Sequence, residues 1–303
     1  MLRKTRIFVI VFFIITIIVF VGYHFINFIS TDRTIPVIQM EKDSITVPVE
    51  GGDKAILEGI KAMDEKDGDI TENLFIESRS NFMEKGRFKV IIAVADQDNH
   101  VVKTEREVTY SNYRSPQFSL TGPLKFEVSE EGHDDLNIAT NIYANDVIDG
   151  NISDKIRISS DYTISRNNPG DYHMEFIVTN SMGDTVKFPV TVTLYSELEE
   201  KGLPKIILSN YLINTPIGNG ADVAGLIEQI EYHDCIYSRG EDGNFYNGEY
   251  DGEGNPMMFD YSSIVIDSNV DWNTSGVYEV KVTFTDEADG LSNFTRCYIN
   301  IYE

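Results

Sequence analysis

Residues 86–94 read GRFKVIIAV, and this stretch decides the fold. From Phe88 to Val94, every second residue is apolar. Such a period of two residues is typical of a β-strand that buries one face in a core. The chain repeats the pattern at residues 170–178 (GDYHMEFIV) and at residues 276–284 (GVYEVKVTF). Three copies of one strand predict three related β-domains.

Other features recur at matching distances from these strands. A proline marks the entry to each unit, at Pro36, Pro116 and Pro204. Because proline favours an extended preceding residue and tolerates the start of an edge strand, each should open a sheet. A polar turn follows each repeated strand, and an alternating strand then closes the unit, most clearly at residues 186–194. Short strands at this turn spacing predict antiparallel sandwiches.

The first two units each contain an acidic turn before the repeated strand. Residues 64–71 read DEKDGDIT and residues 146–153 read DVIDGNIS. Asp-Gly followed by Asp or Asn tolerates positive φ and makes local side-chain hydrogen bonds. Both stretches therefore predict a turn that leads into a strand.

The third unit departs from this pattern in its middle. Residues 242–244 (DGN) stand near the acidic-turn position, and a glycine-rich insertion follows at about 245–260. The stretch 222–232 (DVAGLIEQIEY) offers a short helix capped by Asp222, but the matching stretches of the other units favour strand or loop.

The repeated pattern resembles the bacterial surface immunoglobulin-like repeat, which also occurs in pesticidal crystal proteins. The resemblance rests on the acidic turns, the Gly-x-Tyr/Phe-x-Val-x-Phe strands and the polar turns after them, and it covers about residues 34–196 in full. It implies an all-β chain of tandem sandwiches that act as spacers or binding modules without enzymatic activity. We expect domains at residues 34–113, 114–198 and 203–303.

An apolar run precedes the first unit. Residues 7–29 contain no Asp, Glu, Lys or Arg, and Arg3, Lys4 and Arg6 come before them. A helix of this length would span about 35 Å, enough for a bilayer core of about 30 Å. Basic flanks stay in the cytoplasm, so residues 1–6 should form a cytoplasmic tail and the bulk should be extracellular. The alternative is a cleaved signal, although the run exceeds the usual apolar core of about 7–15 residues.

The net charge of the chain argues against one class of partner. The formal net charge is −24, and phosphate binding requires Lys and Arg. We therefore expect no nucleic-acid partner. The expected partners are the lipid bilayer, through the apolar helix, and an extracellular protein or glycan.

The acidic turns contain groups of carboxylates that could bind a metal ion. Closely spaced carboxylates could bind Ca²⁺ at Asp64, Asp67 and Asp69 or at Asp146, Asp149 and Asn151, but no complete twelve-residue calcium loop is present. The turn explains these residues without a metal. We predict no catalytic, cofactor-binding or metal site.

The cysteines lie in the third unit, and the sequence leaves two arrangements open for them. Cys235 and Cys297 could form a disulfide after export or remain free thiols. The adjacent His233 and Asp234 suggest a thiol nucleophile, yet such chemistry needs placement in space rather than in sequence.

These observations predict a membrane-anchored surface protein that displays sandwiches for adhesion or ligand binding. The third unit is the expected binder, because aromatic and acidic side chains fill its insertion at 241–258. The alternatives are a passive spacer, a subunit of an envelope complex and, last, a membrane-tethered hydrolase.

Overall fold

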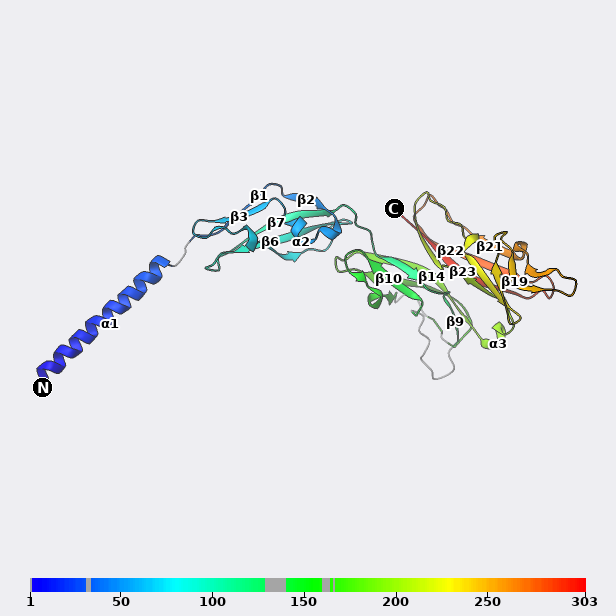
Figure 1. Cartoon of the computed structure of the whole chain (residues 1–303), viewed down its shortest axis with the longest axis horizontal. Coiled ribbons are helices and arrows are strands. Elements are labelled where there is room, and N and C mark those ends of the chain that lie inside the picture. The colour runs from blue at the N-terminus through cyan, green and yellow to red at the C-terminus, as the bar shows by residue number, and fades with distance from the viewer. Residues whose placement is uncertain (1, 31–33, 129–139, 160–163, 166) are drawn as a thin grey trace. The chain divides into compact units, whose positions relative to one another are not determined.

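The chain folds into one apolar helix and a series of β-sandwiches. A computed structural model describes residues 2–30, 34–128, 140–159, 164–165 and 167–303. The described residues divide into two compact units, Met1–Tyr113 and Arg114–Glu303. Figure 1 labels the elements of both units.

Helix α1 (Leu2–Ser30) forms the first element. Within it, Thr5–Ile26 has a mean hydropathy of 2.7 and no buried residues. It is the one helix among the described residues that is long and apolar enough to cross a membrane. A secretory signal near the N-terminus passes the same test of length and apolar composition.

The first sandwich lies in the first unit and packs two sheets of strand orders β1-β3-β4 and β2-β7-β6-β5. Its strands are β1 (Val37–Met40), β2 (Ser44–Val47), β3 (Ile60–Asp64), β4 (Gly68–Asp69), β5 (Phe75–Arg79), β6 (Arg87–Ala95) and β7 (Val101–Tyr110). Phe88, Val90, Ile92 and Val94 are fully buried, as the alternation predicts. Helix α2 (Gly52–Ile56) and the 3₁₀ segments η1 (Val49–Gly51) and η2 (Thr71–Asn73) connect the strands.

The second sandwich repeats this plan, with sheets of order β11-β10-β8 and β12-β13-β14-β9. Its strands are β8 (Gln117–Leu120), β9 (Lys125–Glu127), β10 (Ile142–Asp146), β11 (Gly150–Asn151), β12 (Arg157–Ile158), β13 (Gly170–Thr179) and β14 (Thr185–Tyr195). The 3₁₀ segment η3 (Ser153–Lys155) lies between β11 and β12, and α3 (Glu197–Glu200) follows β14.

The third sandwich has sheets of order β15-β17-β18-β19-β20 and β16-β23-β22-β21. Its strands are β15 (Lys205–Leu208), β16 (Leu212–Pro216), β17 (Ile227–Tyr232), β18 (Cys235–Arg239), β19 (Phe245–Tyr250), β20 (Pro256–Phe259), β21 (Ile264–Ser268), β22 (Gly276–Thr285) and β23 (Ser292–Tyr302). The 3₁₀ segments are η4 (Ala224–Leu226) and η5 (Tyr261–Ser263).

One topology is common to the three sandwiches. In each, the strand after the proline entry joins one sheet, and the next strand crosses to the other sheet, where it pairs in parallel with the last strand. The entry prolines Pro36, Pro116 and Pro204 are buried and directly precede β1, β8 and β15. The prediction of all-β sandwiches after an N-terminal helix is therefore confirmed.

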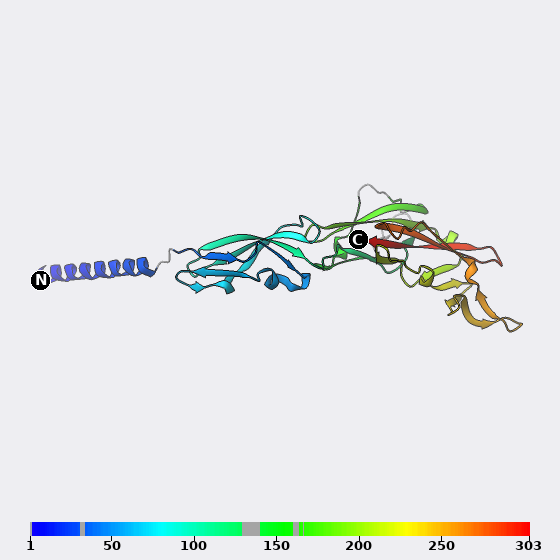
Figure 2. The same ribbon diagram turned by 90° about the horizontal axis from the view of Figure 1, so that it is seen from above.

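In the third sandwich, the structure shows what residues 222–232 and the glycine-rich insertion form. Residues 222–232 form η4 and β17 rather than the alternative helix, and the Asp222 carboxylate accepts a hydrogen bond from the Gly225 amide at 3.0 Å. The glycine-rich insertion is a β-hairpin, β19–β20, which extends the sheet of β15. Figure 2 shows this hairpin, coloured yellow to orange, extending away from the sheets of its sandwich.

The second and third sandwiches share one core. A single cluster of buried apolar side chains runs through both. At the joint, the buried Tyr298 hydroxyl accepts a hydrogen bond from the Thr191 amide at 3.0 Å and donates one to the Thr191 carbonyl at 2.8 Å. The Tyr298 ring packs edge-on against Phe188, with centroids 5.6 Å apart.

An ion-pair network lies beside this joint. Arg296 of β23 is 10% exposed and contacts Asp171 of β13 at 2.5 Å and Glu279 of β22 at 2.8 Å. Burial alone would raise the pKa of Asp171, but hydrogen bonds from Arg296 and Thr193 outweigh it and lower that pKa. The charged network therefore ties β23 to the second sandwich.

Candidate functional site

In the acidic turns of the first two sandwiches, the aspartate carboxylates accept hydrogen bonds from backbone amides of the protein itself. The Asp64 carboxylate is buried and accepts hydrogen bonds from the amides of Lys66 at 2.8 Å and Asp67 at 3.0 Å. The Asp67 carboxylate accepts one from the Gln97 amide, at 2.9 Å, in the turn between β6 and β7. Asp69 accepts one from the Thr71 amide at 3.0 Å.

The second sandwich repeats this network. Asp146 is buried and accepts from the amides of Ile148 at 2.8 Å and Asp149 at 2.9 Å, and from the Asn180 side chain at 3.1 Å. Asp149 in turn accepts from the Ser181 amide at 2.7 Å. The equivalent of Asp69 is Asn151, which accepts from the Ser153 amide at 2.9 Å. These carboxylates link two turns of each sandwich.

In the third sandwich, other residues occupy the position of the buried aspartates Asp64 and Asp146. Tyr232 ends β17, as Asp64 ends β3 and Asp146 ends β10. Its hydroxyl donates a hydrogen bond to Asp289, in the turn between β22 and β23. Burial and the Asp289 carboxylate raise the pKa of Tyr232 to about 12.

His233 and Asp234 form the tight turn between β17 and β18. Their φ angles are +50° and +61°, values that a two-residue hairpin turn requires and that non-glycine residues seldom adopt. The His233 imidazole lies 3.4 Å from the Asp289 carboxylate. Among the described residues, His233, Asp286 and Asp289 form the group whose potential ligand atoms all lie within 4.8 Å of one another.

The cysteines are free thiols. Cys297 is buried in β23, and Cys235 is partly exposed at the start of β18. Burial raises the pKa of Cys297 to about 12, so this thiol stays protonated at neutral pH. His233 and Asp234 precede Cys235 in the turn, and the described contacts of the His233 ring are with Asp289 and with the Tyr232 ring, whose centroid is 3.9 Å away.

The insertion of the third sandwich presents an exposed tip. Tyr250 is 69% exposed and Met257 is 38% exposed. Asp251 accepts hydrogen bonds from the amides of Glu253 at 2.9 Å and Asn255 at 2.8 Å. This carboxylate therefore stabilises the hairpin turn, while the aromatic ring of Tyr250 faces solvent.

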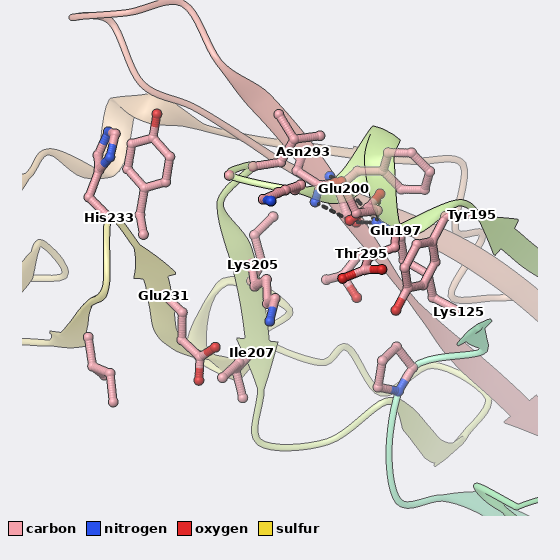
Figure 3. A pocket seen from close by; sticks show the side chains of 18 of the residues that line it. Lys125, Tyr195, Glu197, Glu200, Lys205, Ile207, Glu231, His233, Asn293 and Thr295 are labelled. Atoms are coloured by element: carbon pink, nitrogen blue, oxygen red, sulfur yellow. Dashed lines mark hydrogen bonds and ion pairs between the residues drawn. The ribbon is translucent and has the colours of Figure 1, made fainter. Parts of the chain in front are cut away.

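A hollow of about 960 Å³ lies between the second and third sandwiches. Figure 3 shows His233 on one side of it and Lys125 and Tyr195 on the other. Lys205 and Glu231, which are partners in the register of β15 and β17, lie between the two sides (Figure 3). The lining thus contains positively and negatively charged side chains and several aromatic rings.

A buried polar cluster forms one wall of the hollow. The Lys125 side chain is 14% exposed, and its ammonium contacts the Glu200 carboxylate at 2.7 Å and the Asn293 amide oxygen at 2.9 Å. The Asn293 amide nitrogen donates to Glu200 at 2.8 Å. The ammonium also lies over the rings of Tyr195 and Phe294, 5.5 and 5.0 Å from their centroids.

Tyr195, whose ring lies under the Lys125 ammonium, also lines the hollow. Burial together with Glu127 and Glu200 raises the pKa of Tyr195, which therefore remains a neutral donor at physiological pH. Sequence reasoning missed Lys125, Glu200 and Asn293, because they come from three separate elements. No local pattern marks residues that meet only when two sandwiches pack together.

Comparisons with known proteins give no family for this chain. No family model matches it, and no curated protein matches it. It is similar to a Clostridium perfringens ZmpB structure of the CBM51-2 module in complex with GlcNAc and INT domains, at 19% identity and a TM-score of 0.21, over 48% of this chain and 29% of that one.

Two further structures show similar likeness. Drosophila N-cadherin EC1-3 has 12% identity and a TM-score of 0.29 over 90% of each chain. A lipoprotein from Bacteroides thetaiotaomicron has 16% identity and a TM-score of 0.22, over 60% of this chain and 98% of that one. The chain spans 29% and 31% of the lengths of the two ZmpB structures. At these TM-scores the likeness carries no argument about function.

Proposed function

We propose that this chain is a membrane-anchored cell-surface protein that binds an extended segment of another protein in the hollow between its second and third sandwiches. The apolar helix α1 supports the anchor, and Arg3, Lys4 and Arg6 before it favour a cytoplasmic N-terminus. The proposal includes no catalysed reaction.

The hollow itself carries the proposal. It is lined by β9 and β15, each of which is the edge strand of its sheet. An edge strand offers unpaired amide and carbonyl groups, to which an extended peptide can add as a further strand. A hollow between two such edges suits a peptide better than a compact ligand.

The charges of the lining define the peptide. Lys205 and Glu231 are paired on β15 and β17, and Glu127 and Glu197 also line the hollow. Complementary charges mainly add specificity and faster association, rather than raw affinity. We therefore expect a peptide that alternates basic and acidic residues.

A display library of extended peptides tests this function on the full chain in detergent. We expect saturable binders whose affinity falls at least tenfold, or about 1.4 kcal/mol, in Lys205→Glu and in Glu231→Lys. Lys54→Glu, an exposed reversal on α2, is the matched control and should leave binding unchanged. Binders that respond equally to all three variants, or no binders, would favour the spacer function.

The anchor and its orientation need a separate test. Protease added to intact cells should digest the sandwiches and spare α1 if the bulk is extracellular. Sandwiches that survive this treatment but are digested after the cells are opened would contradict the orientation. Release of the chain into the medium would instead identify α1 as a cleaved signal.

A passive spacer or an envelope-complex subunit is the second candidate. The observation that favours it is the shared core of the second and third sandwiches, which fixes their arrangement through Tyr298 and Arg296. A spacer needs such stiffness, whereas a binder needs only the hollow. Pull-down of a stable membrane partner that is lost when α1 is exchanged for an unrelated apolar helix would support this candidate.

A further inference from the structure

We infer that His233, Asp286 and Asp289 form a binding site for a divalent transition-metal ion of the zinc class. His233 comes from the turn between β17 and β18, and both aspartates come from the turn between β22 and β23. The three residues offer one imidazole nitrogen and two carboxylate oxygens, all within 4.8 Å of one another. An imidazole with two carboxylates is a donor set that suits zinc.

The spacing of two donors fits a tetrahedral ion. Zinc binds imidazole nitrogen and carboxylate oxygen at about 2.0–2.1 Å, so two ligand atoms at a tetrahedral angle lie roughly 3.3–3.4 Å apart. His233 Nε2 and Asp289 Oδ2 are 3.4 Å apart. Coordination would therefore require little movement of this pair.

The carboxylates are held by neighbours that leave a ligand position. Asp289 Oδ1 accepts from the Leu291 amide at 2.8 Å, and Asp289 Oδ2 accepts from the Tyr232 hydroxyl. Asp286 Oδ1 accepts from the Ala288 amide at 3.0 Å. A carboxylate oxygen has two lone pairs, so it can accept such a bond and still ligate. Outer partners of this kind orient metal ligands.

The other sandwiches provide an internal comparison. At the same pair of turns, Asp67 binds the Gln97 amide and Asp149 binds the Ser181 amide, so those carboxylates are consumed in closing the turns. In the third sandwich, Asp286 and Asp289 also accept amides of their own turn, each through Oδ1. What the third sandwich adds at this place is the His233 imidazole, which lies beside both carboxylates.

The charge balance also favours a dication. Two carboxylates with a neutral imidazole give a site of charge −2, which one divalent ion neutralises. Three protein ligands leave a fourth position open to water or to a bound molecule. Because His233 also lines the hollow, the ion would lie at its rim.

Zinc titration of the full chain in detergent, followed by calorimetry, tests the site. His133 and the carboxylates around it lie outside the described residues, so every protein in the test should carry His133→Ala to remove that competing imidazole. We expect one ion per chain. His233→Ala and Asp289→Asn should each weaken binding by at least about 100-fold, since even outer partners are worth about 10–100-fold.

His100→Ala is the matched control, because His100 belongs to the turn between β6 and β7 of the first sandwich, and it should leave zinc affinity unchanged. Circular dichroism should show that each variant keeps its β-sheet. Cobalt in place of zinc should give the intense visible absorption of a tetrahedral site, lost in His233→Ala. Absence of saturable binding, or equal binding by folded His233→Ala, would overturn the site. Because no peptide is used, this result is independent of the proposed function.

Discussion

The turn ends of the second and third sandwiches solve one problem with opposite chemistry. In the second, the buried Asp146 and its neighbour Asp149 collect amide hydrogens from two turns. In the third, the aromatic Tyr232 takes the place of the buried aspartate and donates a hydrogen bond from its hydroxyl to Asp289. The topology around both is the same, so the fold tolerates either acceptor or donor at this position. The difference moves carboxylates from an internal role to an exposed one.

The largest test of this comparison is Asp146→Ala. Three donors, from Ile148, Asp149 and Asn180, would lose their acceptor at a buried site. We expect the free energy of unfolding to fall by about 3 kcal/mol, since each unsatisfied buried donor costs roughly 1–3 kcal/mol. Urea unfolding measures the change. The exposed Asp154→Ala should alter stability by no more than about 0.5 kcal/mol; equal effects would refute the role of Asp146.

The next test asks whether the two sandwiches unfold together. Arg296→Met removes ion pairs to Asp171 and Glu279 from a side chain that is 10% exposed. We expect a loss of about 2 kcal/mol, because a buried guanidinium loses its hydrogen bonds to charged groups, while Asp171 and Glu279 keep access to water.

Calorimetry should show one transition for residues 114–303 in the native chain and two in Arg296→Met. Lys187→Met removes the exposed pair with Glu175 and should keep one transition. Two transitions in the native chain would contradict the shared core.

Tyr232→Phe should cost less, about 1 kcal/mol, because the ring stays and one hydrogen bond is lost. The folded pKa of about 12 lies above the ordinary tyrosine value of about 10. The contribution of this hydroxyl is therefore complete below pH of about 10 and is lost as pH rises through about 12. Unfolding measured across this range should show an alkaline loss in the native chain that Tyr232→Phe lacks.

The smallest effect concerns Asp149. Burial raises the pKa of Asp149, but hydrogen bonds from Ser181 and Lys155 lower it by a larger amount, so the net shift is downward. Its stabilisation is present above the ordinary value of about 3.9 and disappears as pH falls through the lower folded pKa. We expect Asp149→Asn to reduce stability slightly at neutral pH and to flatten the acid limb of the stability profile. An unchanged acid limb would show that other carboxylates determine it.

Local pattern predicted most of the fold. Alternation identified β6, β13 and β22 because a strand with one buried face records its environment in its own residues. Proline entries and acidic turns are equally local, and both lie where expected. The glycines of the insertion did not reveal its strands, because Gly248, with φ of +81°, marks an irregularity inside the β19–β20 hairpin.

The candidate sites depend on distant residues, and this is why sequence alone missed them. The Tyr298 hydroxyl meets Thr191 across 107 positions, and His233 meets Asp289 across 56. Neither contact belongs to a single element or repeat. His233 lies two positions before Cys235 in the sequence, but in the structure its imidazole lies beside an aspartate of another turn.

The position of the joint residues has a consequence for biogenesis. Arg296 and Tyr298 lie on β23, whereas their partners Asp171 and Thr191 precede them by 125 and 107 positions. The ribosome synthesises the second sandwich before β23, at about 5–20 residues per second. The second sandwich is therefore complete several seconds before the strand that covers its surface at the joint. During that interval the uncovered surface is available to chaperones. Any early stop before β23 would leave a chain that quality control can distinguish from the finished one.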